Sequence, residues 1–168
     1  MKTRKSIRLK EYDYSLPGFY FVTICTHKRK CIFGTIINGD YTLNQHGLIA
    51  QKYITQISSH FENANIDCFI VMPNHVHFIV QITHETVGAI HELPLQPSER
   101  RKMLLPKIIG FYKMNVSKQI RLQLLNSNIW QRNYYEHVIR NQEELHSTRE
   151  YIQNNPLHWI EDQYYSQG

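Results

Sequence analysis

The chain has 168 residues, of which 42% are hydrophobic and 20% charged, and its formal net charge of +5 corresponds to a pI of about 9.1. These values are typical of one globular domain spanning residues 1–168, and the positive charge is consistent with a polyanionic partner. Three cysteines without a Cys-x-x-Cys pair exclude a disulfide scaffold and a zinc ribbon, and no apolar run approaches the roughly 20 residues that span a bilayer. We therefore expect a cytoplasmic protein that does not enter a membrane.

The N-terminal part combines a basic arm with a strong strand. Residues 1–16 carry several lysines and arginines but lack the apolar stretch of a signal peptide, so they form either a disordered tail or an arm that contacts phosphates. Residues 19–26 predict a central strand, because aromatic and β-branched side chains favour a pleated surface. A basic cluster follows this strand and is interpreted either as a phosphate contact or as a solvated loop. The cluster consists of His27, Lys28, Arg29 and Lys30.

The next segments predict a small hairpin and a helix. Asn38-Gly39 favours a primed turn, so residues 32–37 and 40–43 are expected to pair as a flap outside the main sheet. Residues 44–61 predict the first helix, since their apolar residues recur at helical spacing and form one stripe.

Two apolar strands in the middle of the chain carry an unusual pair of histidines. Residues 66–72 and 75–82 are rich in isoleucine, valine and phenylalanine, and Pro73-Asn74 joins them as a tight turn. Because side chains alternate between the faces of a strand, His75 and His77 point the same way. Two neutral imidazoles on one face can share a divalent metal ion. The alternative is that one histidine packs in the core while the other is half solvated.

A loop and a second helix follow. Residues 83–99 show no clear period and predict a mobile loop, in which His84 and His91 are either metal ligands or simply exposed. The second helix is expected to start within residues 102–106 and to end near residue 125. It has a basic flank that either contacts a nucleic-acid backbone or is solvated. The flank carries Lys113, Lys118 and Arg121.

The C-terminal part predicts a strand over residues 134–139 and a helix over residues 142–154. Asn141 caps this helix and Glu144 completes a capping box. Pro156 ends the helix, and Asn155 before it is expected to leave helical geometry.

The order of elements predicts the fold class. Strand, flap, helix, strand, strand, helix, strand and helix follow one another along the chain. This order favours an α+β protein, a ferredoxin-like sandwich with a central antiparallel β-sheet and helices packed mainly on one face.

Tyrosines supply the candidate nucleophile. Tyr151 lies on the last helix at the margin of its buried face, where a tyrosine can pack its ring and present its hydroxyl to a cleft. Tyr134 and Tyr135 are adjacent on a predicted strand, so one of them faces away from any given cleft. A metal at the histidine pair and a tyrosine on a facing helix indicate nucleophilic phosphoryl transfer. We expect exposed aromatics, Tyr134 or Trp159, to stack unpaired bases.

Three segments carry a resemblance to a known family. Met-Pro-Asn-His-Val-His at residues 72–77 resembles the His-hydrophobic-His motif of the single-tyrosine HUH transposases. Residues 130–140 (Trp-Gln-Arg-Asn-Tyr-Tyr-Glu-His-Val-Ile-Arg) and 151–156 (Tyr-Ile-Gln-Asn-Asn-Pro) are similar to the C-terminal signature of the REP-associated subgroup. Residues 19–33 add to this similarity, which runs from about residue 17 to residue 159.

The resemblance implies a ferredoxin-like fold, a divalent metal such as Mg²⁺ or Mn²⁺, and single-stranded DNA with hairpins as the substrate and partner. It also implies cleavage through a 5′-phosphotyrosine link. His75 and His77 match the two histidine ligands and Tyr151 matches the nucleophile. Asn155 stands four residues after Tyr151, where insertion-sequence members have a glutamine that completes the metal site.

Several alternatives stay open. The protein is a DNA-cleaving and strand-joining transposase, a catalytically inactive or domesticated hairpin-binding protein of the same fold, or a metal-dependent hydrolase that activates water. It is either a monomer or a homodimer. We expect DNA contacts from the basic residues His27, Lys28, Arg29, Lys30, Lys113, Lys118, Arg121 and Arg132.

Overall fold

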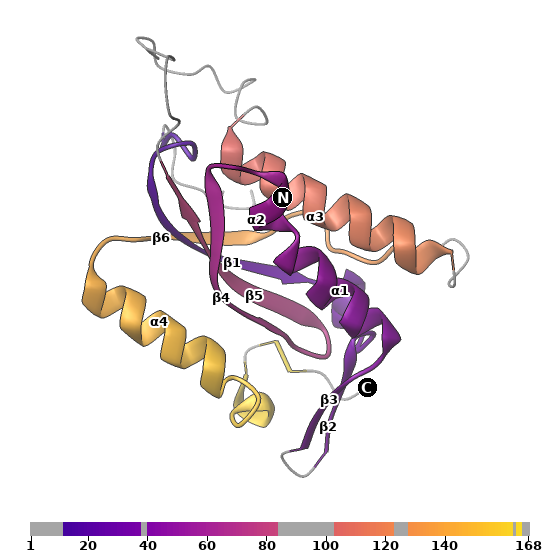
Figure 1. Ribbon diagram of the computed structural model, residues 1–168. Coiled ribbons are helices and arrows are strands. Elements are labelled where there is room, and N and C mark those ends of the chain that lie inside the picture. The colour runs from indigo at the N-terminus through magenta and orange to yellow at the C-terminus, as the bar shows by residue number, and fades with distance from the viewer. Residues whose placement is uncertain (1–11, 38–39, 84–102, 123–127, 163, 166–168) are drawn as a thin grey trace, which may run out of the picture.

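A computed structural model of the protein describes residues 12–37, 40–83, 103–122, 128–162 and 164–165. Its centre is a four-stranded antiparallel sheet with the strand order β4-β5-β1-β6 (Figure 1). The strands are β1 (Gly18–Cys25), β4 (Ala64–Val71), β5 (His75–Ile82) and β6 (Tyr135–Ile139). Each strand expected from the sequence is confirmed, with ends that differ by at most two residues.

The strand with the histidine pair, β5, is held on both edges. It pairs with β4 on one side and with β1 on the other, where His75 lies opposite Cys25 and His77 opposite Thr23. The turn before β5 is fixed as well, because the backbone amide and the hydroxyl of Thr26 both donate to the Asn74 carbonyl, at 2.8 and 2.9 Å. The histidines therefore occupy a rigid part of the sheet.

Within the described residues, four α-helices accompany the sheet. They are α1 (Gln45–Thr55), α2 (Ile57–His60), α3 (Leu104–Arg121) and α4 (Gln142–Asn154). The expected single helix over residues 44–61 is wrong, because Gln56, with φ −78° and ψ −10°, separates α1 from α2. The expected end of α3 near residue 125 lies outside the described residues, as do residues 1–11, most of the predicted loop, including His84 and His91, and the Asn38-Gly39 turn.

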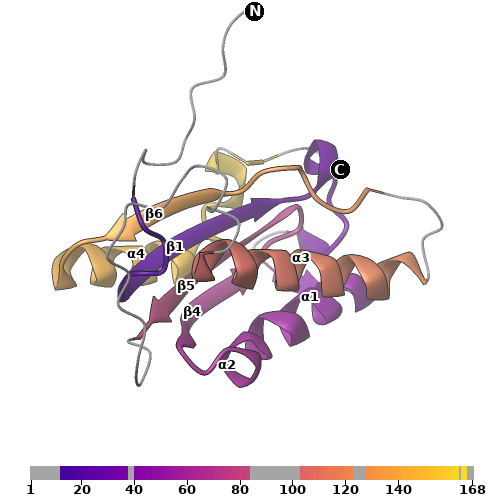
Figure 2. The same ribbon diagram turned by 90° about the horizontal axis from the view of Figure 1, so that it is seen from above.

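The two faces of the sheet carry different helices (Figures 1 and 2). One face packs against α1, α2 and α3 and forms the large core, which includes Val22, Ile24, Val76, Phe78, Leu105 and Tyr112. The other face packs against α4 alone and forms a small core of Ile79, Ile139, Leu145 and Ile152. The prediction of an α+β sandwich with helices mainly on one face is confirmed, and the single helix on the second face carries Tyr151.

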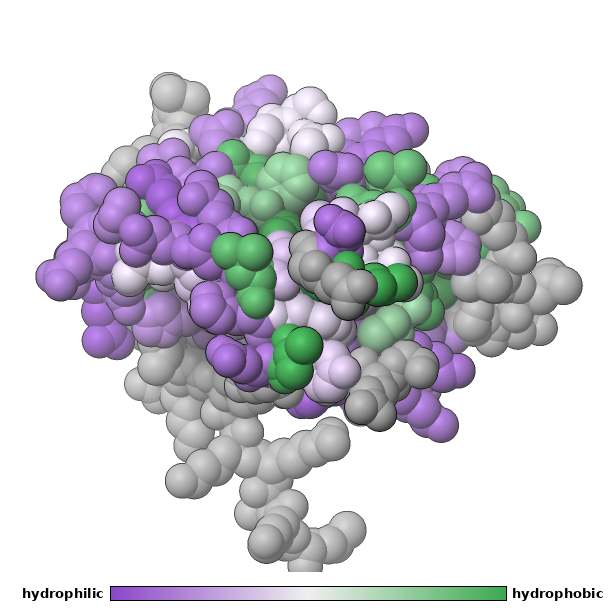
Figure 3. All heavy atoms as spheres, turned by 90° about the horizontal axis from the view of Figure 1, so that it is seen from below, coloured by the Kyte–Doolittle hydropathy of each residue, from purple (hydrophilic) through white to green (hydrophobic). Residues whose placement is uncertain are grey.

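The flap forms a sheet of its own, as expected. Its strands are β2 (Gly34–Ile37) and β3 (Asp40–Leu43), and the Tyr41 hydroxyl anchors it by donating to the Val71 carbonyl. The flap and the segment after α4 lie at the lower end of Figure 1. Seen from that side, hydrophobic residues gather near the centre and hydrophilic residues surround them (Figure 3). Within the described ranges no helix has the length and apolar character to cross a membrane.

Candidate active site

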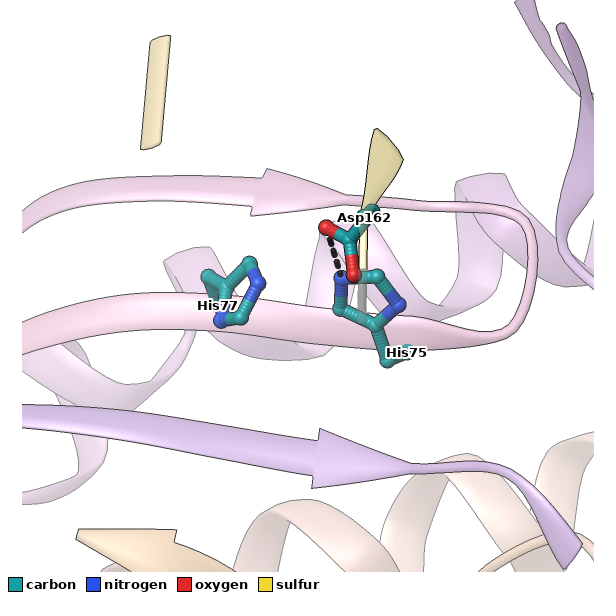
Figure 4. A group of neighbouring side chains, drawn as sticks. All are labelled: His75, His77 and Asp162. Atoms are coloured by element: carbon teal, nitrogen blue, oxygen red, sulfur yellow. Dashed lines mark ion pairs between the residues drawn. The ribbon is translucent and has the colours of Figure 1, made fainter. Parts of the chain in front are cut away.

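The histidine pair forms the floor of the candidate site. His75 and His77 are fully buried, their ring centroids are 4.5 Å apart, and both side chains lie on the same face of β5 (Figure 4). The alternative in which one histidine is half solvated is therefore wrong. The face they share is the one covered by α4, since Ile79, two residues further on, packs in the small core.

Each imidazole is held through its Nδ1 atom. His75 Nδ1 lies 2.8 Å from Asn74 Oδ1, and His77 Nδ1 lies 2.8 Å from Thr23 Oγ1. The Asn74 amide nitrogen donates to two carbonyls, those of Tyr164 at 2.7 Å and Arg29 at 3.2 Å, so its oxygen is the atom that faces His75. His75 must then donate from Nδ1, which leaves its Nε2 with a free lone pair.

The two Nε2 atoms are buried and make no hydrogen bond with any described residue. The pKa of His75 is lowered to about 3, chiefly by burial and to a smaller extent by the nearby Arg29 cation, while the Asn155 side chain acts in the opposite direction. Burial also holds the pKa of His77 well below its ordinary value, with His75 as a smaller cause. Both rings are therefore neutral at pH 7, the form that binds a metal ion.

A carboxylate that the sequence analysis missed completes this cluster. Asp162 Oδ2 lies 3.9 Å from His75 Nε2, and the side chain of Asp162 is only 2% exposed (Figure 4). Donor atoms of Asp162, His75 and His77 all lie within 4.8 Å of one another. Asp162 is itself held, because the Asn155 amide donates to Oδ2 at 3.0 Å and the Tyr164 backbone amide donates to Oδ1 at 2.6 Å.

Asn155 lies beside the cluster with helical backbone geometry. Its φ of −55° and ψ of −39° show that the expected departure from the helix is wrong, because the turn continues through a bond from the His158 amide to the Asn155 carbonyl. Asn155 therefore projects from the same side of α4 as Tyr151, four residues earlier. Its Oδ1 is buried and makes no hydrogen bond with a described residue, so it is a further candidate donor to a metal ion.

The helix that carries Tyr151 begins at the predicted Asn141 cap, but the expected capping box is wrong, because the Glu144 carboxylate accepts from the Arg140 amide in place of the Asn141 amide. Asn141 Oδ1 accepts a hydrogen bond from the Glu144 amide at 2.8 Å, and the Glu144 carboxylate accepts one from the Arg140 amide at 2.7 Å. Leu145 and Ile152 are buried against the sheet. Tyr151 precedes Ile152, so it stands at the edge of this packed face.

Tyr151 stands next to His77. The two ring centroids are 5.3 Å apart, and a second edge contact at 6.0 Å joins Tyr151 to Phe21. The side of the site on which Tyr151 lies is open to solvent, since Tyr151 is 42% exposed. Partial burial raises the pKa of Tyr151, the Asp162 charge raises it further, and the Asn155 side chain opposes both. The phenol is therefore protonated at pH 7 and needs help to become a nucleophile.

The other candidate tyrosines, Tyr134 just before β6 and Tyr135 at its start, have side chains that face opposite sides of the sheet. Tyr134 is 8% exposed and belongs to the large core, whereas Tyr135 is 37% exposed and lies on the side of the site. Trp159 is 6% exposed. The expectation that Tyr134 or Trp159 is an exposed stacking residue is therefore wrong, and Tyr135 and Tyr151 are the exposed aromatics among the described residues of this region.

The basic cluster after β1 is divided between two places. Lys28 and Arg29 both have φ of 56°, a left-handed backbone that non-glycine residues rarely adopt. The turn directs Arg29 toward the site, where its guanidinium lies 5.3 Å from the centre of the Tyr164 ring. His27, Lys28 and Lys30 instead line a separate cavity of about 420 Å³.

The basic flank of α3 forms one side of a groove. The groove has a volume of about 690 Å³ and is lined by Lys113, Lys118, Arg121 and Arg132 among others. Lys113 is engaged there, because its ammonium donates to the carbonyls of Gln131 at 2.5 Å and Arg132 at 3.3 Å. Asn128 and Ile129 line both this groove and the cavity at residues 27–30, so the two basic regions are neighbours.

Comparisons with known proteins agree with this geometry. No family model matches the chain. An uncharacterized protein of Haemophilus influenzae is 40% identical over 168 residues, which cover 96% of this chain and 93% of that protein. A second protein of that organism, named as a REP-associated tyrosine transposase, is 27% identical over 86% of this chain and 73% of its own length. The structure of a REP-associated tyrosine transposase bound to a REP hairpin shares the fold, with a TM-score of 0.55 and 18% identity over 95% of this chain and 76% of that one.

The fold and the site define a class of protein: an α+β protein in which a His-x-His pair on a central strand faces a tyrosine on a helix. The resemblance to the REP-associated tyrosine transposases is confirmed as a similarity in sequence to a protein of that name and in fold to a solved structure of one.

Proposed function

We propose that the protein nicks and rejoins single-stranded DNA at sites associated with hairpins, with Tyr151 as the nucleophile. The observation that carries this proposal is a pair of buried imidazoles whose Nε2 atoms make no hydrogen bond with a described residue, one of which, His77, lies next to the ring of Tyr151. Buried polar atoms without partners are costly, about 1–3 kcal/mol each, so a pair of them indicates a ligand. From the similarity to REP-associated tyrosine transposases we also expect a transposase-like activity and hairpin DNA as the substrate.

The donor set fits a divalent metal ion such as Mg²⁺ or Mn²⁺. Two neutral imidazoles and the Asp162 carboxylate converge within 4.8 Å, and Asn155 offers an amide oxygen nearby. Carboxylate and amide oxygens are ligands that Mg²⁺ and Mn²⁺ prefer, and neutral imidazole is a common metal ligand. Nδ1 contacts of the kind made by Asn74 and Thr23 orient metal-binding histidines. When bound, the ion withdraws charge from the oxygens of the scissile phosphate.

The protein's own residues position the attack. The rigid helix α4 holds the Tyr151 hydroxyl beside the histidine pair, as in-line displacement requires. The tyrosine oxygen forms a bond to phosphorus, the bond to the 3′-oxygen breaks, and the phenol proton passes to solvent on the open side. The 3′-oxygen leaves as a hydroxyl after taking up a proton. Its return to phosphorus releases Tyr151 and joins the strands.

We assign the binding of the DNA backbone to the two neighbouring basic regions. Lys28, Lys30, Lys118 and Arg132 are exposed and line the cavity and the groove described above. Arg29 extends this positive region to the site itself. Lys113 has a positioning role, because it holds the main chain of residues 131–133 in place.

The test is incubation of the protein with 5′- and 3′-labelled single-stranded hairpin oligonucleotides and Mn²⁺, followed by denaturing electrophoresis. We expect a covalent adduct with wild type and none with Tyr151→Phe. Cleavage without an adduct, retained by Tyr151→Phe, would instead identify a hydrolase that activates water. Binding without cleavage under all metal conditions would identify a hairpin-binding protein that has lost catalysis.

The metal site is tested separately by calorimetric titration of Mn²⁺. Wild type should bind one ion, and the His75→Ala, His77→Ala double variant should bind none at this site. Equal binding by the two proteins would contradict the proposed site.

A further inference from the structure

We infer that the cleft beside Tyr151 binds one unpaired base next to the scissile phosphate by stacking on Tyr135. This inference rests on the proposed function and adds a binding site for the nucleobase to it. The cleft has a volume of about 400 Å³, at the small end of ligand pockets, which range over about 300–1,000 Å³. It has room for one nucleotide and excludes a hairpin stem.

The position of the cleft fixes what can occupy it. His77 and Phe21 form its floor, Tyr151 and Tyr135 stand on its walls, and Tyr164 closes one side. Because the nucleophile itself lines the cleft, an occupant must be within about one nucleotide of the phosphorus under attack. The ligand class is therefore a single unpaired nucleotide of the substrate strand.

Tyr135 is a large aromatic residue that belongs to neither core and leaves part of its ring exposed. It is 37% exposed on the edge strand β6, whereas its neighbour Tyr134 is 8% exposed and packs in the large core. Its ring centroid lies 6.2 Å from that of Tyr164 at an angle of 52°, so the two rings do not stack on one another. The exposed part of the Tyr135 ring is thus available to a planar partner.

The polar groups on the α4 wall are already used as donors. The hydroxyls of Ser147 and Thr148 donate to the Glu144 carbonyl at 3.0 and 2.6 Å. His137 is paired with the Glu144 carboxylate through Nε2 at 2.5 Å. Among the described residues of this wall, few free donors remain to read the edge of a base. The cleft therefore recognises the base by stacking on its face. Stacking tolerates any of the four bases but requires that a base be present.

The experiment measures binding by the Tyr151→Phe protein, so that no chemistry occurs. Fluorescence anisotropy is recorded with hairpin oligonucleotides in which an abasic site replaces each base of the single-stranded part in turn. At one position next to the cleavage site mapped with wild type, the abasic site should weaken binding about 5- to 150-fold, the loss of one base–aromatic stack. Replacement by a different base at that position should have a much smaller effect.

A second substitution ties the effect to the cleft. Tyr135→Ala should weaken binding of the intact oligonucleotide by a similar factor and add little to the abasic loss, whereas Tyr135→Phe should bind like its parent. Thermal unfolding shows whether each variant is folded. Additive losses, or no sensitive position, would overturn the stacking site even if wild type forms its adduct. Failure of wild type to form an adduct would contradict the proposed function instead.

Discussion

On one face of β5, Val76, Phe78 and Val80 pack against α1 and α3, and on the other face His75 and His77 lie beneath α4 and the segment that follows it. All five side chains are fully buried, so exposure does not separate the two faces. The difference is in their partners: apolar atoms on one side meet apolar atoms, whereas both Nε2 atoms on the other side make no hydrogen bond with a described residue.

This contrast shows how the fold can accommodate its site. The large core is continuous and carries most of the buried apolar side chains, while the core under α4 has only four fully packed members. Two buried polar atoms without partners cost about 1–3 kcal/mol each, which only the extensive packing of the first face can offset. Substitutions on each face test whether one face supplies stability while the other carries the site.

The largest effect concerns which tyrosine forms the bond to DNA. Peptide mapping of the trapped adduct should place the DNA on Tyr151, and Tyr151→Phe should form no adduct, because phenylalanine lacks the attacking oxygen. The free energy of unfolding should change by about 0.5 kcal/mol or less, because the Tyr151 side chain is 42% exposed. DNA attached to Tyr135, which lines the same cleft, would show the assignment to be wrong.

A cavity in the apolar face should affect stability and leave the site intact. Phe78→Ala removes a fully buried ring and should lower the free energy of unfolding by about 3–5 kcal/mol, measured by urea denaturation. At a temperature where the variant is folded, calorimetry should find the wild-type affinity for Mn²⁺. A loss of metal affinity in the folded variant would show that the two faces are coupled.

Substitution of Asp162, the carboxylate near the histidines, distinguishes a role in metal binding from a role in packing. Asp162→Asn keeps the shape of the side chain but removes its charge, so Mn²⁺ affinity in calorimetry should fall about 10- to 100-fold. Glu161→Gln is the matched control, since Glu161 is the neighbouring acid and is exposed. If both variants bind Mn²⁺ like wild type, Asp162 is not a ligand and Asn155 remains the candidate for that position.

The smallest effect concerns the basic groove, remote from the metal site. Replacing Lys118 and Arg132 by alanine should reduce the slope of log affinity against log salt by roughly 0.7 for each phosphate of a single strand that the variant no longer neutralises. Lys52→Ala on α1 is the control, because Lys52 is exposed but does not line the groove. An unchanged slope in the double variant, or an equal change in the control, would contradict the proposed path of the backbone.

The strands and the placement of His75 and His77 on one face could be predicted from the sequence. Period-2 patterning indicates the strands, and Asn141 indicates the start of α4, because these are local properties of neighbouring residues. The same locality explains the correct prediction that Tyr134 and Tyr135 face opposite ways.

The tertiary structure alone decided which side chains meet. Asp162 and Tyr164 lie in a short segment after α4 without a periodic pattern, and only the packing of that segment against Asn74 brings them to the histidines. The break at Gln56 and the helical geometry of Asn155 likewise depend on the turns around them. The division of residues 27–30 between the site and the cavity follows from the left-handed turn at Lys28 and Arg29. Contacts between distant segments depend on how the whole chain packs, and no spacing along the sequence encodes them.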